Sequence, residues 1–528
     1  MRKLLITALG TCFAAAALAH EDDAAKALKG LGSVNFANSC SPSVQQKLQR
    51  GVAMLHSFWY SAGEATFQEV AAADPSCAVA AWGFASILMG NPLGGIGASP
   101  KDAPRAQAAI DKGREMGAKT EREKDYLEAV AAYYQDFANR PERERQVARA
   151  KAYEALAAKY PKDDEAQIFY ALYLASTQLQ SDQSYSAYLQ AAAILEKQFA
   201  RHPNHPGVAH YLIHSYDAPP IAQKGVPAAK RYAAIAPDAP HALHMPSHIF
   251  TRVGAWQESA ATNRRSADVA MKGGEPDGAA HAMDYMMYAY LQLARDADAR
   301  NTYEELLRLA KFNPAASTAP YATAAMPARY AIERGAWREA ANLAVVPSRF
   351  PFTEAITYHA RALGAARAGD VAQAKTDLAQ IEERRDALRA AKNDYWATEV
   401  EVMRLSAAAW IALLEDRADE AVGMMREAAD TEDRQEKHIV TPGRVLPARE
   451  LLGDMLMELK RPAEALKEYE RSQKREPDRF RGLYGAALAA EMAGDARSAR
   501  RYYARLVQVA GKGEPRAELK LARTYLEQ

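Results

Sequence analysis

Residues 241–253 separate into a polar side and an apolar side when they are placed on a helix at 100° per residue. The polar side, an arc of about 100°, holds His241, His244, His248, Thr251 and Arg252. The neighbouring arc holds Ala242, Leu243, Met245, Ile249, Phe250 and Val253. This pattern predicts one amphipathic helix. Pro246 falls inside it, and a proline there either kinks a helix or marks a later start, which would turn His241 and His244 away from the polar side.

A longer pattern repeats near the C-terminus, in residues 446–477 and 480–511. Ala465 recurs as Ala499 and Tyr469 as Tyr503, each 34 residues later, and Leu452-Gly453 is matched by Ala486-Ala487. A period of 34 residues is typical of repeats that consist of two helices joined by a turn. The sequence therefore predicts consecutive helix pairs in this part of the chain.

A second internal copy supports the same organisation. Residues 254–260 (Gly-Ala-Trp-Gln-Glu-Ser-Ala) and 335–341 (Gly-Ala-Trp-Arg-Glu-Ala-Ala) both stand where a first helix is expected to turn into a second. Related phrases begin at Gly369-Asp370 and Gly494-Asp495. In each, a glycine ends one helix and a small residue lets the next helix pack closely against it.

These repeats resemble the tetratricopeptide repeat (TPR) family, and the middle of the chain resembles exported bacterial proteins that contain such repeats. The closer resemblance rests on residues 74–77 with Trp82-Gly83, on residues 205–217 and on residues 239–252. It covers most of residues 44–526 and is strongest from Gly207 onward. The resemblance implies an all-α fold, a right-handed superhelical solenoid of antiparallel helix pairs, in which the first helix of each pair lines the concave surface.

The first nineteen residues have the features of a signal peptide. Arg2 and Lys3 precede an apolar run that ends in Ala17-Leu18-Ala19, so we expect cleavage after Ala19 and a periplasmic or secreted protein. Cys12 lies in a poor lipobox, which makes a lipoprotein the weaker alternative. The expected divisions of the remaining chain are an N-terminal extension (20–42), divergent helical repeats (43–206), histidine-rich TPR-like repeats (207–315) and C-terminal TPR-like repeats (316–528).

Charge and cysteine content narrow the expected partners and environment. Lys and Arg together number 67 and Asp and Glu 66, so no bulk charge attracts nucleic acid, and we expect no nucleic-acid partner. After the signal peptide no stretch is apolar enough for a membrane span. Cleavage leaves Cys40 and Cys77, and an even pair in an oxidising compartment predicts a disulfide; two buried thiols are the alternative.

Histidines cluster in the middle of the chain. Of the twelve, seven lie between residues 202 and 248, and an eighth is His281. His210 and His214 are four residues apart, as are His244 and His248, and the two pairs are separated by 34 residues. In the next repeat, 37 residues after His244 and His248, the equivalent positions hold His281 and Tyr285. The expected result is two columns on successive helices: His210, His244 and His281, and beside them His214, His248 and Tyr285.

By the TPR resemblance, the ligand-facing positions fall on the polar side described above and on residues of neighbouring first helices. We expect an exported binding or scaffold protein whose histidine-rich concave groove holds a protein, a peptide or a small polar ligand. The residues expected to bind it are His210, His214, Asp217, His241, His244, His248, Thr251, Arg252, Tyr285 and Tyr288. No phosphate loop, Gly-x-Ser-x-Gly elbow or Cys-His pair is apparent, so no residue is assigned as catalytic and a binding protein is expected rather than an enzyme.

A transition-metal site is the alternative function. Two histidines at i and i+4 can share one ion, and neutral imidazoles suit Zn or Cu. The expected ligands are His210, His214, His244, His248 and His281, with Asp217 or Asp284 as further candidates. Such a site would store or deliver a metal or serve a metal-dependent hydrolase, although the chain has no His-Glu-x-x-His motif near the cluster. The third possibility is that these histidines are spacers hydrogen-bonded between helices.

Overall fold

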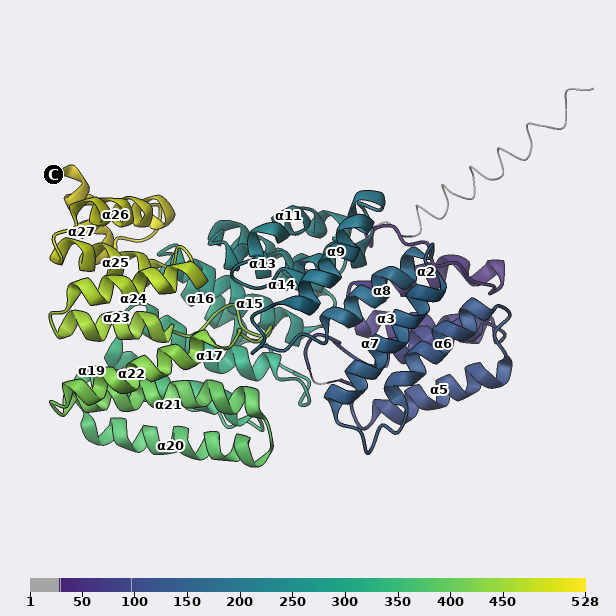
Figure 1. Ribbon diagram of the computed structural model, residues 1–528, viewed down its shortest axis with the longest axis horizontal. Coiled ribbons are helices and arrows are strands. Elements are labelled where there is room, and N and C mark those ends of the chain that lie inside the picture. The colour runs from purple at the N-terminus through teal and green to yellow at the C-terminus, as the bar shows by residue number, and fades with distance from the viewer. Residues whose placement is uncertain (1–27, 29, 96) are drawn as a thin grey trace, which may run out of the picture. The chain divides into compact units, whose positions relative to one another are not determined.

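The structure, a computed structural model, describes residues 28, 30–95 and 97–528. The described residues form helices, turns and loops without a strand (Figure 1). The prediction of an all-α fold is therefore confirmed. The predicted signal peptide and the cleavage site after Ala19 lie outside the described residues. Within the described part of the chain, no helix is long and apolar enough to cross a membrane.

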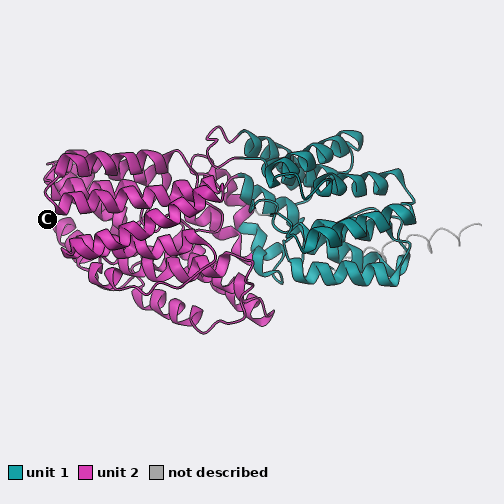
Figure 2. Cartoon of the chain, turned by 90° about the horizontal axis from the view of Figure 1, so that it is seen from below, with its two compact units in different colours: residues 1–178, 186–215, 230–242 teal, residues 179–185, 216–229, 243–528 magenta. Residues whose placement is uncertain are grey.

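The chain folds into two compact units, which Figure 2 shows in different colours. Unit 1 comprises residues 1–178, 186–215 and 230–242, and unit 2 comprises residues 179–185, 216–229 and 243–528. The division passes through two helices, α11 (Val226–Ile235) and α12 (Pro240–His244). The domain boundaries expected from the sequence stay a prediction.

Unit 1 consists of helices that pack on their neighbours along the chain. They are η1 (Pro42–Val44), α2 (Gln45–His56), α3 (Tyr60–Ala73), α4 (Ala78–Leu88), α5 (Asp102–Met116), α6 (Glu121–Tyr134), α7 (Glu142–Lys159), α8 (Asp164–Ala175), α9 (Ser186–Arg201) and α10 (Pro206–Ser215). Each of α2 to α10 contacts the next, and α10 also contacts α2 and α8. Contacts between alternate helices, such as α2 with α4, α4 with α6 and α8 with α10, are what a stack of helix pairs requires, because each pair buries its apolar face against the next pair.

The helices of unit 2 are also packed in pairs. They are η2 (Ala222–Gly225), α13 (Pro246–Arg252), α14 (Trp256–Lys272), α15 (Pro276–Gln292), α16 (Asp296–Leu306), α17 (Thr318–Glu333), α18 (Trp337–Ala341), α19 (Pro351–Ala368), α20 (Val371–Ala390), α21 (Asp394–Leu414), α22 (Ala418–Asp433), α23 (Ala448–Glu458), α24 (Pro462–Arg475), α25 (Phe480–Met492), α26 (Ala496–Ala510) and α27 (Ala517–Glu527). The odd-numbered helices from α15 to α25 each contact the next odd-numbered helix, and α15 also contacts α25. They therefore form one layer that curves back on itself within unit 2.

The repeat read from the sequence is present in the C-terminal helices. The pairs α23–α24 and α25–α26 place Ala465 and Ala499 at fully buried positions, and Tyr469 and Tyr503 at 2% exposure each. The ring of Tyr469 lies against Gly453, where an added Cβ would come within 2.6 Å of its Cζ atom. A small residue on one helix thus makes room for the tyrosine of the next, and these pairs are TPR-like.

The N-terminal segment before α2 is fastened to unit 1 by covalent and polar contacts. Cys40 and Cys77 form a disulfide, which confirms the predicted pairing. Beside it, the backbone N–H and hydroxyl of Ser39 donate to the Glu123 carboxylate at 2.7 and 2.6 Å. The two cysteines are 37 residues apart, and a cross-link that closes a loop of this length stabilises a fold by roughly 3 to 4 kcal/mol, mainly by restricting the unfolded chain.

Candidate functional site

Six of the eight clustered histidines form two groups of three, one in each unit. We name His244, His248 and His281 the unit 2 centre. We name His210, His214 and His241 the unit 1 centre. In each group the ring nitrogens that could act as ligands all lie within 4.8 Å of one another. Two members of each group are buried and the third, His281 or His241, is half-buried.

Residues 241–253 form two helices, so the prediction of a single helix is wrong. The helix α12 ends at His244 and α13 begins at Pro246, because proline has no N–H to donate into a preceding turn and its ring excludes the carbonyl there. His244 and His248 nevertheless stay together across this break, with 3.0 Å between their Nε2 atoms. His241 does not join them, and its Nε2 lies 3.2 Å from Nε2 of His210.

Hydrogen bonds on the far side of each ring orient the unit 2 centre. Nδ1 of His244 donates to Oδ1 of Asn263 at 2.7 Å, and Nδ2 of Asn263 in turn donates to the Ser259 carbonyl at 2.8 Å. Nδ1 of His248 donates to Oδ2 of Asp217 at 2.8 Å. Because both acceptors are oxygens without a proton, the proton of each neutral ring is on Nδ1. Both Nε2 atoms therefore present a lone pair to the centre.

Charged side chains lie beside His248 on one side of the unit 2 centre. Burial raises the pKa of Asp217, but Lys437, Arg252 and His248 outweigh it and hold this pKa well below its usual range. Arg252 donates from Nε to Oδ1 of Asp217 at 2.8 Å, and Nζ of Lys437 lies 3.5 Å from Oδ2. Burial lowers the pKa of Lys437 to about 8, partly offset by Asp217. Burial also lowers the pKa of His244 and His248, so both rings favour the neutral form.

A segment of the chain itself covers this side of unit 2. We name residues 434–447, which connect α22 to α23 without forming a helix, the strap. The hydroxyl of Tyr285 donates to the carbonyl oxygens of Ile439 and Thr441 at 3.0 and 2.9 Å. Nη2 of Arg329 donates to the carbonyl oxygen of Gly443 at 2.8 Å. The strap is thus held by the carbonyl oxygens of residues 439, 441 and 443, and a turn in which the Thr441 N–H donates to the His438 carbonyl at 3.2 Å shapes it.

The residues expected to line a groove are enclosed instead. Of the ten, His241 is half-buried and the other nine are less than 9% exposed. In unit 2 the strap explains part of this burial, because it covers Tyr285 and supplies Lys437 to Asp217. Thr251 lies near Ser259 with 3.3 Å between their hydroxyls, and Tyr288 contacts the buried guanidinium of Arg479. The role of these residues in binding a ligand stays a prediction.

The grouping also differs from the two expected columns. His281 joins His244 and His248, with Tyr285 3.4 Å from Nε2 of His248, while His210 and His214 belong to the other centre. Of the further ligand candidates, Asp217 orients His248 from outside, and Asp284 pairs with Arg329. Sequence reasoning missed His241 as a potential metal ligand. The signal that could have found it was Pro246, which ends the helix before His241 can share a side with His248.

A third buried group shows what a hydrogen-bonded histidine cluster looks like in this protein. Nε2 of His56 and Nε2 of His205 lie 2.9 and 3.0 Å from the two oxygens of Glu165. Nδ1 of His205 accepts from the Val208 N–H, so its proton is on Nε2 and is donated to Glu165. The polar atoms of this group satisfy one another. In the unit 2 centre the two Nε2 atoms contact each other directly instead, at 3.0 Å.

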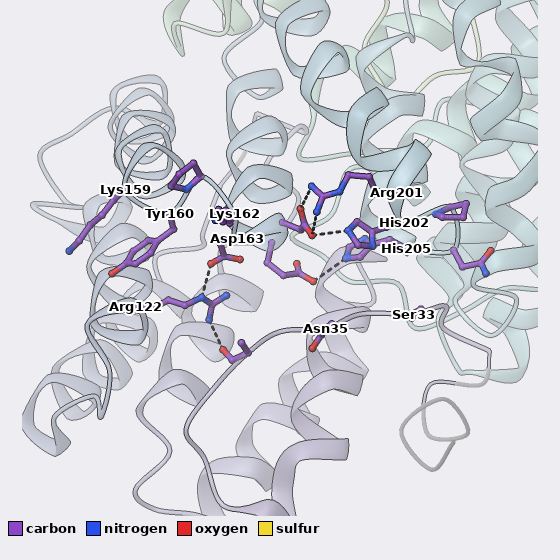
Figure 3. Close-up of a pocket in the computed structure, with 16 residues that line it drawn as sticks. Ser33, Asn35, Arg122, Lys159, Tyr160, Lys162, Asp163, Arg201, His202 and His205 are labelled. Carbon is purple, nitrogen blue, oxygen red and sulfur yellow. Dashed lines mark hydrogen bonds and ion pairs between the residues drawn. The ribbon is translucent and has the colours of Figure 1, made fainter. Parts of the chain in front are cut away.

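Unit 1 also contains a cavity of about 710 Å³, shown in Figure 3, which the sequence did not indicate. Arg122 reaches Asp163 across it, with 2.6 Å between Nε and Oδ2. Arg201 and His202 both contact Asp164, at 2.7 and 2.8 Å. Carboxylates that line the cavity thus engage Arg122, Arg201 and His202.

The comparisons with known proteins leave the function open. No family model matches the chain, and no curated protein matches it. Among solved structures it is similar to the crystal structure of the APC/C hetero-tetramer Cut9–Hcn1. The sequence identity is 11%, the match covers 92% of this chain and 97% of that chain, and the TM-score is 0.29. A TM-score this low supports no conclusion about function.

Proposed function

We propose that this protein binds a transition-metal ion at the unit 2 centre, through Nε2 of His244, Nε2 of His248 and a ring nitrogen of His281. The observation that carries the proposal is that two Nε2 lone pairs meet at 3.0 Å while both Nδ1 atoms donate to oxygens. Two nitrogens that each lie about 2.0 Å from a tetrahedral Zn²⁺ are roughly 3.3 Å apart. A metal ion turns this repulsive contact into a favourable one.

A shared proton is the competing explanation for the short contact. It would make one of the two rings an imidazolium, and burial disfavours that charge, since it lowers the pKa of His248 by more than Asp217 raises it. Asp217 is already engaged on the other side of His248, where it also holds Arg252 and Lys437. Histidines whose second nitrogen donates to a carboxylate or amide oxygen are typical of metal centres, because that bond orients the ring and makes it a better ligand.

The donor set indicates the kind of metal. Three neutral imidazoles suit Zn²⁺, Cu²⁺ or Ni²⁺ and are poor ligands for Mg²⁺ or Ca²⁺, which prefer oxygen. The hydroxyl of Tyr285 is the nearest oxygen, 3.4 Å from Nε2 of His248. Since Tyr285 also holds the strap, the centre is enclosed, which suits retention of a metal better than turnover of a substrate. We assign no catalytic residue.

The test is the metal content of the full chain after purification without chelators. Wild type is expected to carry bound Zn, Cu or Ni, and His244→Ala/His248→Ala is expected to lose about one equivalent. His202→Ala is the control, because His202 lies outside both centres and contacts Asp164. Wild-type protein with less than about one tenth of an equivalent of any transition metal would sink the proposal, since a functional site stays largely filled. So would a folded double variant with unchanged metal content.

Peptide binding on the strap-covered face of unit 2 is a second candidate. It is supported by the way Tyr285 and Arg329 hold three carbonyl oxygens of the strap, contacts that an external peptide of the same sequence could copy. The probe is a labelled peptide of residues 434–447. Thr441→Ala, which loosens the strap at Arg329, is expected to bind it more tightly than wild type does, and a scrambled peptide is the control. Equal binding of both peptides would reject this candidate.

We also propose that the protein is exported, because its first nineteen residues have the features of a signal peptide. A mature periplasmic or secreted protein would begin at His20. N-terminal sequencing of the protein from its native host tests this, and an uncleaved Met1 would contradict it.

A further inference from the structure

The unit 1 centre repeats the construction of the unit 2 centre from a different part of the chain. His210 and His214 are one turn apart on α10, and His241, from the start of α12, completes the group. In the unit 2 centre His244 and His248 are likewise four residues apart, and His281 comes from a later helix, α15. A pair at i and i+4 with a third histidine from a following helix thus occurs twice.

The tautomer of His210 is fixed by the backbone. Its Nδ1 donates to the carbonyl oxygen of His56 at 2.7 Å. His56 is the last residue of α2, where a carbonyl has no N–H of its own helix to accept from. With the proton on Nδ1, Nε2 of His210 presents its lone pair to Nε2 of His241, 3.2 Å away. This spacing is close to the roughly 3.3 Å expected for two ligands of one tetrahedral Zn²⁺ ion.

Aromatic rings hold the ligands from the sides. The ring of Tyr232 stacks on His210 with 5.2 Å between centroids and an angle of 18°. Phe58 meets His210 edge-on at 4.4 Å and stacks with His241 at 5.5 Å. Rings packed in this way restrict rotation of the imidazoles, which keeps the nitrogens converged.

We propose that His210, His214 and His241 form a second transition-metal centre, in unit 1, that binds its ion independently of the unit 2 centre and more weakly. The difference in affinity follows from the outer partners. His248 donates to the carboxylate of Asp217, whereas His210 donates to a neutral backbone carbonyl. A carboxylate makes the ring a stronger donor and offsets part of the ion's charge, and such outer partners change metal affinity by about 10- to 100-fold.

Titration of Co²⁺ into the metal-free full chain tests this, because tetrahedral Co²⁺ absorbs visible light. Wild type is expected to bind two equivalents of Co²⁺, the second with an affinity about 10- to 100-fold lower than the first. His244→Ala/His248→Ala should keep only the weak equivalent, and His210→Ala/His214→Ala only the tight one. A folded His244→Ala/His248→Ala variant that binds no Co²⁺ would overturn the second centre, while wild-type binding of one equivalent would leave the unit 2 proposal standing.

A single substitution tests the same inference in case a double variant fails to fold. His241→Ala removes the half-buried ligand and is the smallest change to the packing. It is expected to weaken the second equivalent by at least ten-fold without changing the first, with an unchanged circular dichroism spectrum. His202→Ala, also in unit 1, should leave both equivalents unchanged. A folded His241→Ala variant with wild-type Co²⁺ binding would overturn the inference.

Discussion

Oδ1 of Asn263 accepts a hydrogen bond from Nδ1 of His244 at 2.7 Å, and this contact decides which nitrogen of His244 faces His248. Asn263 is itself oriented by the Ser259 carbonyl, which accepts from its Nδ2. The amide oxygen cannot donate, so Nε2 of His244 is left with a lone pair 3.0 Å from Nε2 of His248. One buried amide on α14 thus sets the tautomer of His244 in the unit 2 centre.

Replacement of Asn263 is expected to change metal affinity without removing a ligand. Asn263→Leu removes the acceptor and should weaken binding of Zn²⁺ at the unit 2 centre by about 10- to 100-fold. Asn263→Asp keeps an acceptor and adds a negative charge, so its affinity should equal or exceed that of wild type. Competition with a coloured chelator measures both. Equal affinities of the two variants would show that this hydrogen bond does not serve a metal.

The hydroxyl of Tyr285 is expected to hold the strap in place. Tyr285→Phe leaves the carbonyls of Ile439 and Thr441 without this donor, which should cost about 1 to 2 kcal/mol of local stability. Amide hydrogen exchange in residues 436–443 should then become about 5- to 30-fold faster. Tyr290→Phe, on the same helix with its ring against Arg295, is the matched control. Unchanged exchange in the strap of Tyr285→Phe would contradict this role.

His359 is expected to make stability depend on pH. It is 5% exposed, and burial lowers its pKa from 6.5 to about 4. The unfolded chain therefore takes up this proton first, so the contribution is complete above pH 6.5 and is lost as the pH falls towards 4. The loss is at most about 3 kcal/mol. In urea unfolding, the difference between wild type and His359→Gln should change over this range. A difference that is constant with pH would refute the prediction.

Two glycines in neighbouring helices are expected to respond in opposite ways to the same substitution. An added Cβ at Gly453 would come within 2.6 Å of the Tyr469 ring, so Gly453→Ala should lower the free energy of unfolding by about 1 to 3 kcal/mol. An added Cβ at Gly423 meets no atom within 4 Å, so Gly423→Ala on α22 should raise it by up to about 1 kcal/mol. Thermal unfolding of both variants measures the contrast, and a stabilised Gly453→Ala would disprove the packing argument.

The sequence was sufficient where the structure depends on contacts near in the chain or on a repeated spacing. The 34-residue recurrence of Ala465 and Tyr469 predicted helix pairs, because residues at the same position of successive repeats meet the same neighbours. The two cysteines left after the predicted cleavage predicted the disulfide, since no other pairing was available. The spacing of four residues placed His210 beside His214, and His244 beside His248.

Only the tertiary structure decided how these pairs are completed and what covers them. His241 joins His210 across 31 residues, and Tyr285 meets the strap across 154 residues. Helical periodicity specifies which side of a helix a residue occupies, but not which distant segment packs on that side. That choice depends on how the odd-numbered helices of unit 2 curve until α15 contacts α25, and on the strap between α22 and α23, whose alternate carbonyls are bound by buried donors.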